Sequence, residues 1–209
     1  MALHFVNLDR IERFFRSVDA RFGRRGRILL LGETSQLVEG WRRFIDEIEF
    51  VSVVNAGDRP DFNRIVVETA LGMDVRVTDE HPGEVIPLPS GHEERERPLA
   101  SNAWAAGMSL SFAHFDPYAV SFRYLARGGE TDYQLVIRYL ENGWIDWDEM
   151  TDRLDRLLPE FSFDTIQQDP AEFRRRYGGL FQMWKQRRPD LTRAPFSNLV
   201  GRNGALTEK

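Results

Sequence analysis

The chain has 209 residues, of which 42% are hydrophobic and 29% are charged, and its formal net charge is −5. This length fits one domain, or one domain with a small helical extension, and the composition excludes a disordered chain. The sequence has no cysteine, which excludes disulfides and thiolate metal sites, and no apolar run is long enough to cross a membrane. Because no signal-peptide core follows Met1, we expect a cytoplasmic protein without a membrane partner.

The first half of the chain predicts helices that alternate with strands. Asn7 precedes apolar residues spaced three to four positions apart, which predicts a helix that ends at Gly23. The short apolar run 28–31 predicts a strand covered on both faces and ends at Gly32. The elements expected next are, in order, a brief helix over 36–43, a strand over 45–54, a helix around 62–69 and a strand over 73–78.

The second half predicts a loop, one strand and a helical region. Prolines and charged residues fill 80–102, which predicts a loop with an edge strand around 85–88. Residues 108–115 predict a strand, and Asp116-Pro117 marks the start of the helical region. Four helices are expected there, over 117–127, 131–142, 147–158 and 170–187.

These elements predict an α/β (α+β) fold in which a mixed sheet is flanked by helices and followed by a C-terminal helical region. We expect a sheet domain over residues 1–115 and a helical region over 116–188 packed on it. Residues 189–209 are expected to form a flexible basic tail.

Two carboxylates fall on one face of the strand expected over 45–54. Because side chains alternate along a strand, Glu47 and Glu49 share a face, lie roughly 7 Å apart and come within reach of Mg²⁺. Asp74, on the polar face of the next expected strand, is the candidate for a third ligand, and Asp79 is the alternative. The pattern predicts a magnesium site at the sheet.

A phosphate site is expected beside these carboxylates. Gly32 ends a strand and opens a helix, where backbone N–H groups can approach phosphate oxygens, and Thr34 or Ser35 adds a hydroxyl donor. Arg123 and Arg127, four residues apart on a predicted helix, share a face that can bind phosphate. An equally open interpretation pairs these two arginines with nearby acids such as Glu130 and Asp132.

Two stretches carry a resemblance to a known family. Leu31-Gly32-Glu33, a spacer of 13 residues (34–46) and then Glu47-Ile48-Glu49-Phe50 resemble the motif of the nucleotidyltransferase superfamily. Residues 115–132, with Gly143-Trp144-Ile145-Asp146, resemble the helical half of bacterial AbiEii-type members from abortive-infection and toxin–antitoxin systems.

The resemblance implies a nucleotidyltransferase-like fold and metal-dependent transfer of a nucleotidyl group from a nucleoside triphosphate. It assigns the metal-binding, catalytic role to Glu47, Glu49 and Asp74, and phosphate binding to Gly32, Thr34 and Ser35. Arg123 or Arg127 would lie near the nucleotide. Two positions depart from the family pattern, since Glu33 replaces a small residue and Glu47 replaces an aspartate.

Three functions therefore stay open. The first is a nucleotidyltransferase that uses Mg²⁺ and a nucleoside triphosphate. The second is a catalytically inactive member that acts through a partner protein, such as a cognate toxin, antitoxin or phage-defence protein. The third is RNA binding by the basic C-terminal region, where residues 174–209 hold 9 Lys and Arg against 2 acids.

Overall fold

The computed structural model describes residues 5–101, 103–161 and 169–191. Within these ranges the chain forms seven α-helices and a five-stranded mixed sheet, which confirms the predicted α+β class. None of the helices described has the length and apolar character that a membrane span requires. The tail beyond residue 191, for which we expected a flexible basic segment, lies outside the described residues.

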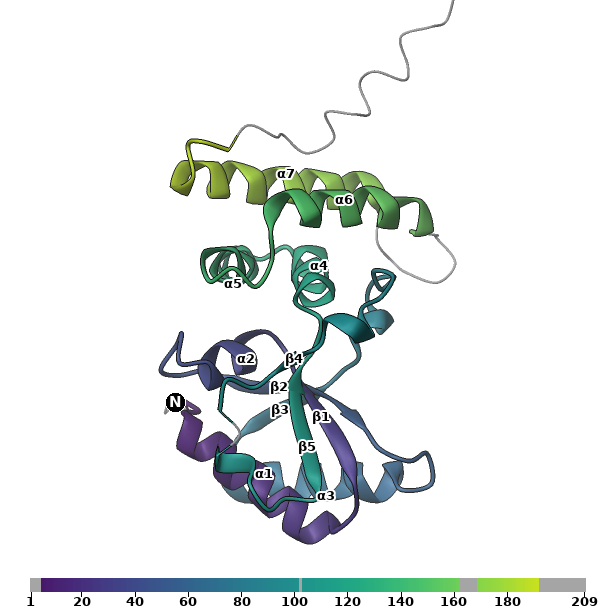
Figure 1. Cartoon of the computed structure of the whole chain (residues 1–209). Helices are drawn as coiled ribbons and strands as arrows, with labels where there is room; N and C mark the ends of the chain where they lie inside the picture. Colours follow the sequence, from purple (N-terminus) through teal and green to yellow (C-terminus); the bar gives the residue numbers. More distant parts are fainter. Residues whose placement is uncertain (1–4, 102, 162–168, 192–209) are drawn as a thin grey trace, which may run out of the picture. The chain divides into compact units, whose positions relative to one another are not determined.

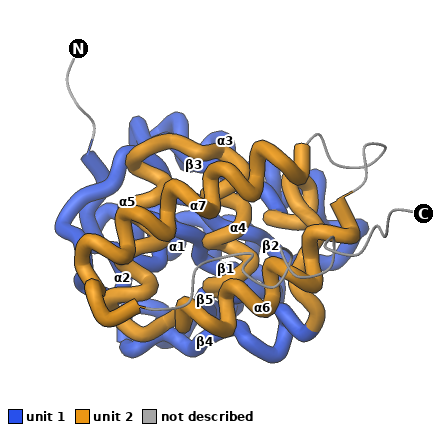
Figure 2. The backbone as a smooth tube through the Cα atoms, turned by 90° about the horizontal axis from the view of Figure 1, so that it is seen from above, with its two compact units in different colours: residues 1–81, 91–116 blue, residues 82–90, 117–209 orange. Residues whose placement is uncertain are grey.

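The chain divides into two compact units, coloured separately in Figure 2. Unit 1 consists of Met1–His81 and Gly91–Asp116, and unit 2 consists of Pro82–Ser90 and Pro117–Lys209. Residues 82–90 therefore group with the helical part of the chain, whereas the sequence analysis placed them with the sheet.

Unit 1 contains the whole sheet. Its strand order is β3-β2-β1-β5-β4; β1 runs antiparallel to β2 and parallel to β5, β3 is parallel to β2, and β4 is antiparallel to β5. The elements of unit 1 are α1 (Leu8–Phe22), β1 (Gly26–Leu30), α2 (Gly32–Val38), β2 (Glu47–Val53), α3 (Arg59–Met73), β3 (Arg76–Asp79), β4 (Arg97–Pro98) and β5 (Leu110–His114).

Helices α1 and α3 cover one face of the sheet, as Figure 1 shows, and the core of unit 1 lies between them and the strands. The side chain of Asn7 accepts a hydrogen bond from the backbone N–H of Arg10 at 3.0 Å, which fixes the start of α1 as predicted. The ring of Phe15, from α1, packs edge-on against Phe50 of β2 and Phe112 of β5, with centroids 5.4 and 5.1 Å apart.

Three predicted boundaries in this region are wrong. Helix α2 starts at Gly32 and ends at Val38, earlier at both ends than predicted. Strand β3 starts at Arg76, because α3 continues to Met73. The edge strand is β4 at Arg97–Pro98, not residues 85–88, where the N–H groups of Val85 and Ile86 bond back to the carbonyl of Pro82 and form a turn.

Unit 2 is a group of four helices: α4 (Pro117–Arg127), α5 (Glu130–Glu141), α6 (Trp147–Leu157) and α7 (Pro170–Arg187). The ring of Trp147 stacks on Tyr177 with centroids 5.0 Å apart, which joins α6 to α7. Near the start of α5, the carboxylate of Asp132 accepts the N–H of Gly129 at 2.9 Å, so Asp132 serves as a helix-start residue.

Candidate functional site

The two candidate carboxylates of β2 share one face of the sheet, as alternation requires. The register pairs Glu47 with Arg76 and Glu49 with Thr78, so the side chain of Thr78 lies on the same face as both glutamates. The hydroxyl of Thr78 donates a hydrogen bond to Glu47. The residues between and after them, Ile48 and Phe50, point to the opposite face and are fully buried in the core.

The two glutamates differ in exposure. Glu47 is half-buried, whereas Glu49 is 6% exposed. Its backbone is also fixed on both sides, since its carbonyl accepts the N–H of Leu31 at 3.0 Å and its own N–H donates to the hydroxyl of Thr34 at 2.7 Å. The pair lies beside the connection from β1 to α2, and Arg76, which is paired in register with Glu47, has its side chain on the same face.

The structure places Asp74 outside β3, and this corrects the strand assignment made from the sequence. Asp74 is the residue that ends α3, with a left-handed backbone (φ 51°), and its carbonyl accepts a hydrogen bond from Arg10 at 2.9 Å. Asp74 lies two positions before Arg76, the residue of β3 that pairs with Glu47. Asp74 therefore does not occupy the position beside Glu47 and Glu49 that the sequence analysis gave it.

The alternative third ligand, Asp79, lies on the other face of the sheet. It is paired in register with Phe50, and its carboxylate accepts the backbone N–H of Ser52 at 2.8 Å and the hydroxyl of the same residue. Arg59 contacts this carboxylate at 3.5 Å. Asp79 thus serves to tie β2, β3 and the start of α3 together.

The candidate phosphate ligands lie at the connection from β1 to α2. Gly32 is buried at the first position of α2 and has φ 42°, a backbone conformation that favours glycine. Thr34 is fully buried, and its hydroxyl oxygen accepts the N–H of Glu49. Ser35 is 1% exposed and contacts His114. Glu33 forms an ion pair with Arg42, one of the arginines that can neutralise it.

A buried hydrogen-bonded group at the same place escaped the sequence analysis. The Nδ1 atom of His114 lies 3.0 Å from the hydroxyl of Ser35, and its Nε2 atom lies 2.8 Å from the carboxylate of Glu39. Burial is the main cause that lowers the pKa of His114, although Glu39 opposes it. Serine, histidine and glutamate are the residue types of a hydrolase triad.

The group has a structural role, because a substrate cannot reach a serine that is 1% exposed or a histidine that is fully buried. It connects the middle and the C-terminal end of α2 to β5, and Glu39 also accepts the N–H of Ala100 at 3.1 Å. No spacing in the sequence signals this group, since Ser35 and His114 are 79 positions apart.

The candidate arginines belong to α4 in unit 2, whereas Glu47 and Glu49 belong to unit 1. The guanidinium groups of Arg123 and Arg127 lie 5.5 and 5.1 Å from the ring centre of Tyr124. Arg127 also approaches Asp132 at 3.7 Å, which confirms for this residue the pairing with a nearby acid.

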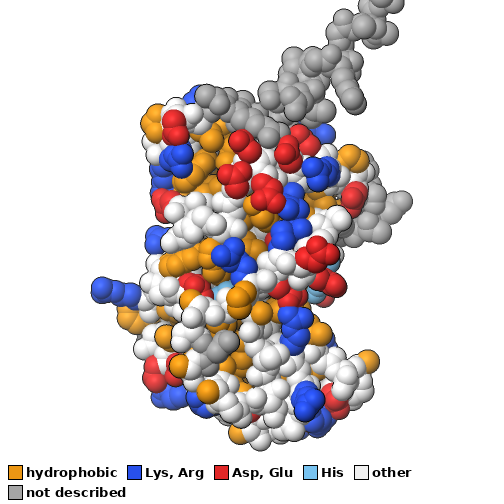
Figure 3. Space-filling view, in the orientation of Figure 1, with side chains coloured by type: hydrophobic (Ala, Val, Ile, Leu, Met, Phe, Trp, Pro, Cys, Tyr) orange, Lys and Arg blue, Asp and Glu red, His pale blue; other side chains and the backbone are white. Residues whose placement is uncertain are grey.

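Three basic residues of α7, and Arg188 at its C-terminal end, form ion pairs with acidic residues. Arg175 and Arg176 both contact Glu172, Arg187 contacts Glu141, and Arg188 contacts Asp190. On the face drawn in Figure 3, acidic and basic side chains lie close together over the helices of unit 2. This mixed pattern is typical of a solvated helix surface.

The donor set at the β2 face consists of two carboxylates and the hydroxyl of Thr78. Mg²⁺ binds to one or two carboxylates with phosphates and water in its remaining positions, so Glu47 and Glu49 fit one such ion at most. In the part of the chain that the structure describes, no group of three or more His, Asp and Glu side chains is arranged to hold a metal. Searches against protein-family models, curated proteins and solved structures find no match to this chain.

Proposed function

We propose that this chain is a nucleotidyltransferase-fold protein that acts in the cytoplasm by binding a partner protein and does not transfer nucleotides itself. The kinship is supported by the order α1-β1-α2-β2-α3-β3, by the glycine that opens α2, and by the glutamate pair on β2. A cognate protein of a toxin–antitoxin or phage-defence pair is the kind of partner that the sequence resemblance suggests.

The position of Thr78 carries the proposal that the chain is inactive. Two-metal nucleotidyl transfer requires several carboxylates that converge on the metals, because the ions must clamp both the attacking and the leaving oxygens. Strand β3 presents Thr78 on the face of Glu47 and Glu49, while Asp79 faces the other way and is bound to Ser52 and Arg59. The hydroxyls of Thr34 and Ser35, which would contact phosphates, are buried within unit 1.

A thermal-shift titration tests the proposal. A competent site at a ligand concentration of 100 times the dissociation constant would stabilise the protein by about 2.7 kcal/mol. For a chain of this size that corresponds to roughly 5–11 °C in melting temperature. We expect no Mg²⁺-dependent shift with any of the four nucleoside triphosphates, and no radiolabel transferred from them to protein or RNA. A shift that Glu47→Gln abolishes would refute the proposal.

A gain-of-function variant sharpens this test. Thr78→Asp places a third carboxylate on the face of Glu47 and Glu49, where mutual repulsion lowers stability in the absence of metal. We expect Mg²⁺ to raise the melting temperature of Thr78→Asp and not that of the uncharged control Thr78→Asn. If Mg²⁺ affects neither variant, this face is not a modified metal site, and the proposed kinship loses its support.

The second candidate function is the active enzyme. It is favoured by one observation, the shared face of Glu47 and Glu49, which leaves a half-buried carboxylate beside a buried one. In that case, Mg²⁺ would be held by these two residues and by the triphosphate, and Glu47→Gln and Glu49→Gln would each abolish labelling of an acceptor.

A further inference from the structure

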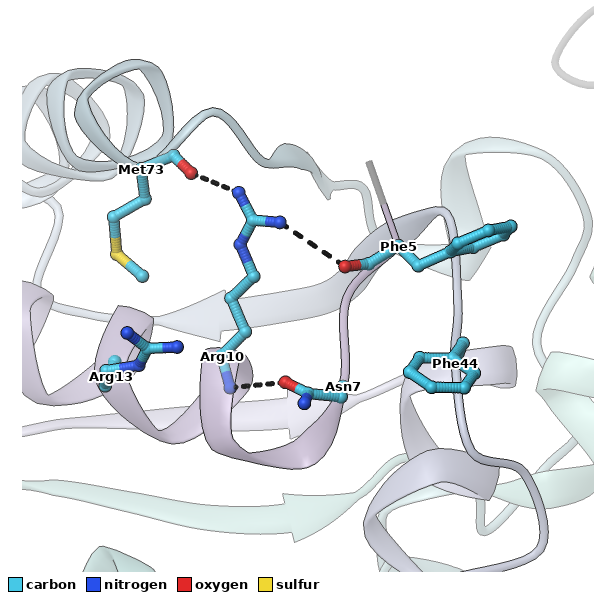
Figure 4. A pocket seen from close by; sticks show the side chains of 6 residues that line it. All are labelled: Phe5, Asn7, Arg10, Arg13, Phe44 and Met73. Carbon is cyan, nitrogen blue, oxygen red and sulfur yellow. Dashed lines mark hydrogen bonds between the residues drawn. The ribbon is translucent and has the colours of Figure 1, made fainter. Parts of the chain in front are cut away.

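A hollow of about 420 Å³ lies on the surface of unit 1, and neither Glu47 nor Glu49 lines it. Figure 4 shows its lining, which comes from the segment before α1, from α1 itself, from the segment before β2 and from the end of α3. The lining residues are Phe5, Asn7, Arg10, Arg13, Phe44 and Met73. A volume of this size accommodates one or two side chains of a peptide.

Two aromatic rings stand exposed at this hollow. Phe5 is 48% exposed and Phe44 is 53% exposed, and their ring centroids are 5.9 Å apart. The neighbouring residues Val6 and Ile45 exchange two backbone hydrogen bonds, of 2.8 and 2.9 Å, and this bridge holds both rings on one surface. Exposed aromatic side chains that are fixed in place are typical anchors of protein interfaces.

The hollow also contains a fixed positive charge. The guanidinium group of Arg10 donates to the backbone carbonyls of Phe5 at 3.3 Å and of Met73, as Figure 4 shows, and also to that of Asp74 at 2.9 Å. Carbonyl oxygens orient the guanidinium but do not neutralise its charge. Arg13 adds a second cation, which is paired with Asp9 at 2.8 Å, and none of the six lining residues is acidic. The hollow is therefore complementary to an anion beside an apolar group.

We propose that this hollow docks a peptide segment of a partner protein in which an acidic side chain lies next to an apolar one. The carboxylate pairs with Arg10, and the apolar side chain packs against Phe5 and Phe44. This inference shares one premise with the proposed function, which is that the partner of this chain is a protein.

The charges around the hollow favour a peptide over a nucleic acid. A phosphodiester chain needs several uncommitted cations along its path. Here Arg13 is paired with Asp9, and Arg42 is paired with Glu33. A neighbouring hollow of about 510 Å³, which shares Asn7 and Phe44, is lined by the acids Asp9 and Glu12 as well as by Arg42 and Arg43. A continuous strand of phosphates would meet these acids, whereas one carboxylate at Arg10 would not.

The experiment uses the full wild-type chain as bait for a displayed library of random heptapeptides. We expect the selected peptides to share an acidic residue adjacent to a Leu, Ile, Phe or Met. Fluorescence polarisation with a labelled selected peptide measures the affinity. Phe44→Ser and Arg10→Gln should each weaken binding by at least about tenfold, as expected for anchors at the centre of an interface.

The matched control changes exposed apolar residues elsewhere on unit 1. Val67 and Leu71 on α3 are 54% and 76% exposed, and the variant Val67→Ser/Leu71→Ser should bind the peptide like the wild type. Because Arg10→Gln also removes contacts to backbone carbonyls, the melting temperature of this variant is measured. If Arg10→Gln is unfolded, the test depends on Phe44→Ser, which changes an exposed side chain.

Four results would overturn the proposal. The first is that the selected peptides lack the acidic–apolar pair, and the second is that the peptide binds Phe44→Ser as tightly as the wild type. The third is that the wild type binds a labelled single-stranded RNA heptamer and Phe44→Ser does not. The fourth is that deletion of residues 2–4 causes a large gain in affinity for the peptide. The last result would assign the hollow to the chain's own N-terminus. None of them affects the Mg²⁺ and nucleotide tests, so this inference and the proposed function can fail separately.

Discussion

Replacement of Thr34 by valine tests whether this hydroxyl supports the fold or binds a ligand. In the structure its oxygen accepts the backbone N–H of Glu49 at 2.7 Å, and both residues are buried. Valine has nearly the same shape but no acceptor, so the variant leaves a buried N–H of β2 without its partner. An unsatisfied buried donor costs about 1–3 kcal/mol. The melting temperature should therefore fall by about 2–12 °C.

Thermal unfolding followed by circular dichroism measures this effect, and urea unfolding gives the free energy of unfolding independently. Thr34→Ser is the matched control, because it keeps the acceptor and loses only a methyl group, at a cost of about 1 kcal/mol. The reasoning is refuted if Thr34→Val is as stable as the wild type. A variant of unchanged stability that has lost affinity for a nucleoside triphosphate would instead return Thr34 to the phosphate role implied by the resemblance.

Two further predictions concern buried groups in the two units. Because burial lowers the pKa of His114 below 6.5, the unfolded chain binds a proton at this residue more readily than the folded chain does. The free energy of unfolding should therefore fall as the pH drops below about 6.5, by at most about 1.4 kcal/mol per pH unit, and level off below the folded-state pKa. Urea unfolding from pH 4 to 8 measures this component, which His114→Gln should lose; a pH profile of the variant equal to that of the wild type would contradict the prediction. Gly128 and Gly143 both have positive φ (74° and 66°), but a Cβ atom at Gly128 would lie 2.7 Å from Arg176, whereas one at Gly143 would meet nothing within 4 Å. Gly128→Ala should therefore lower the melting temperature more than Gly143→Ala, for which only the backbone cost of about 1–2 kcal/mol applies, and equal effects would show that Arg176 moves aside freely.

Elements with strong local signals could be predicted from the sequence. Asn7 and Gly23 delimit α1, and Pro117 begins α4, because capping groups and fixed backbone angles act within one helical turn. The shared face of Glu47 and Glu49 follows from alternation within a single strand. Such features depend on neighbours in the chain and need no knowledge of tertiary contacts.

The position of Asp74 could not be predicted, because two periods overlap there. Met73 alternates with Val75 and Val77 as in a strand, but it also continues the helical spacing from Thr69. The helix prevails, and Asp74 becomes its end, where Arg10 binds the last carbonyls. A contact 64 positions distant in the sequence thus helps to decide where the strand begins.

The burial of Thr34 and Ser35 also lay beyond sequence reasoning. A hydroxyl after a strand-end glycine has the same local pattern whether it faces a ligand or the interior. Here the partners are Glu49 and His114, which reach α2 from two different strands. Only the assembled sheet determines which way these side chains point.

The outer strands of the sheet are short, and this limits how another chain can associate with it. Strand β4 has two residues, one of them Pro98, and β3 has four, including the charged Arg76 and Asp79. Proline and charge at a border discourage backbone pairing with a foreign strand, and so few residues offer little backbone to extend. Recognition of unit 1 by strand addition is thereby disfavoured, and selectivity for a binding protein must come from side-chain chemistry, which point substitutions can alter without disturbing the sheet.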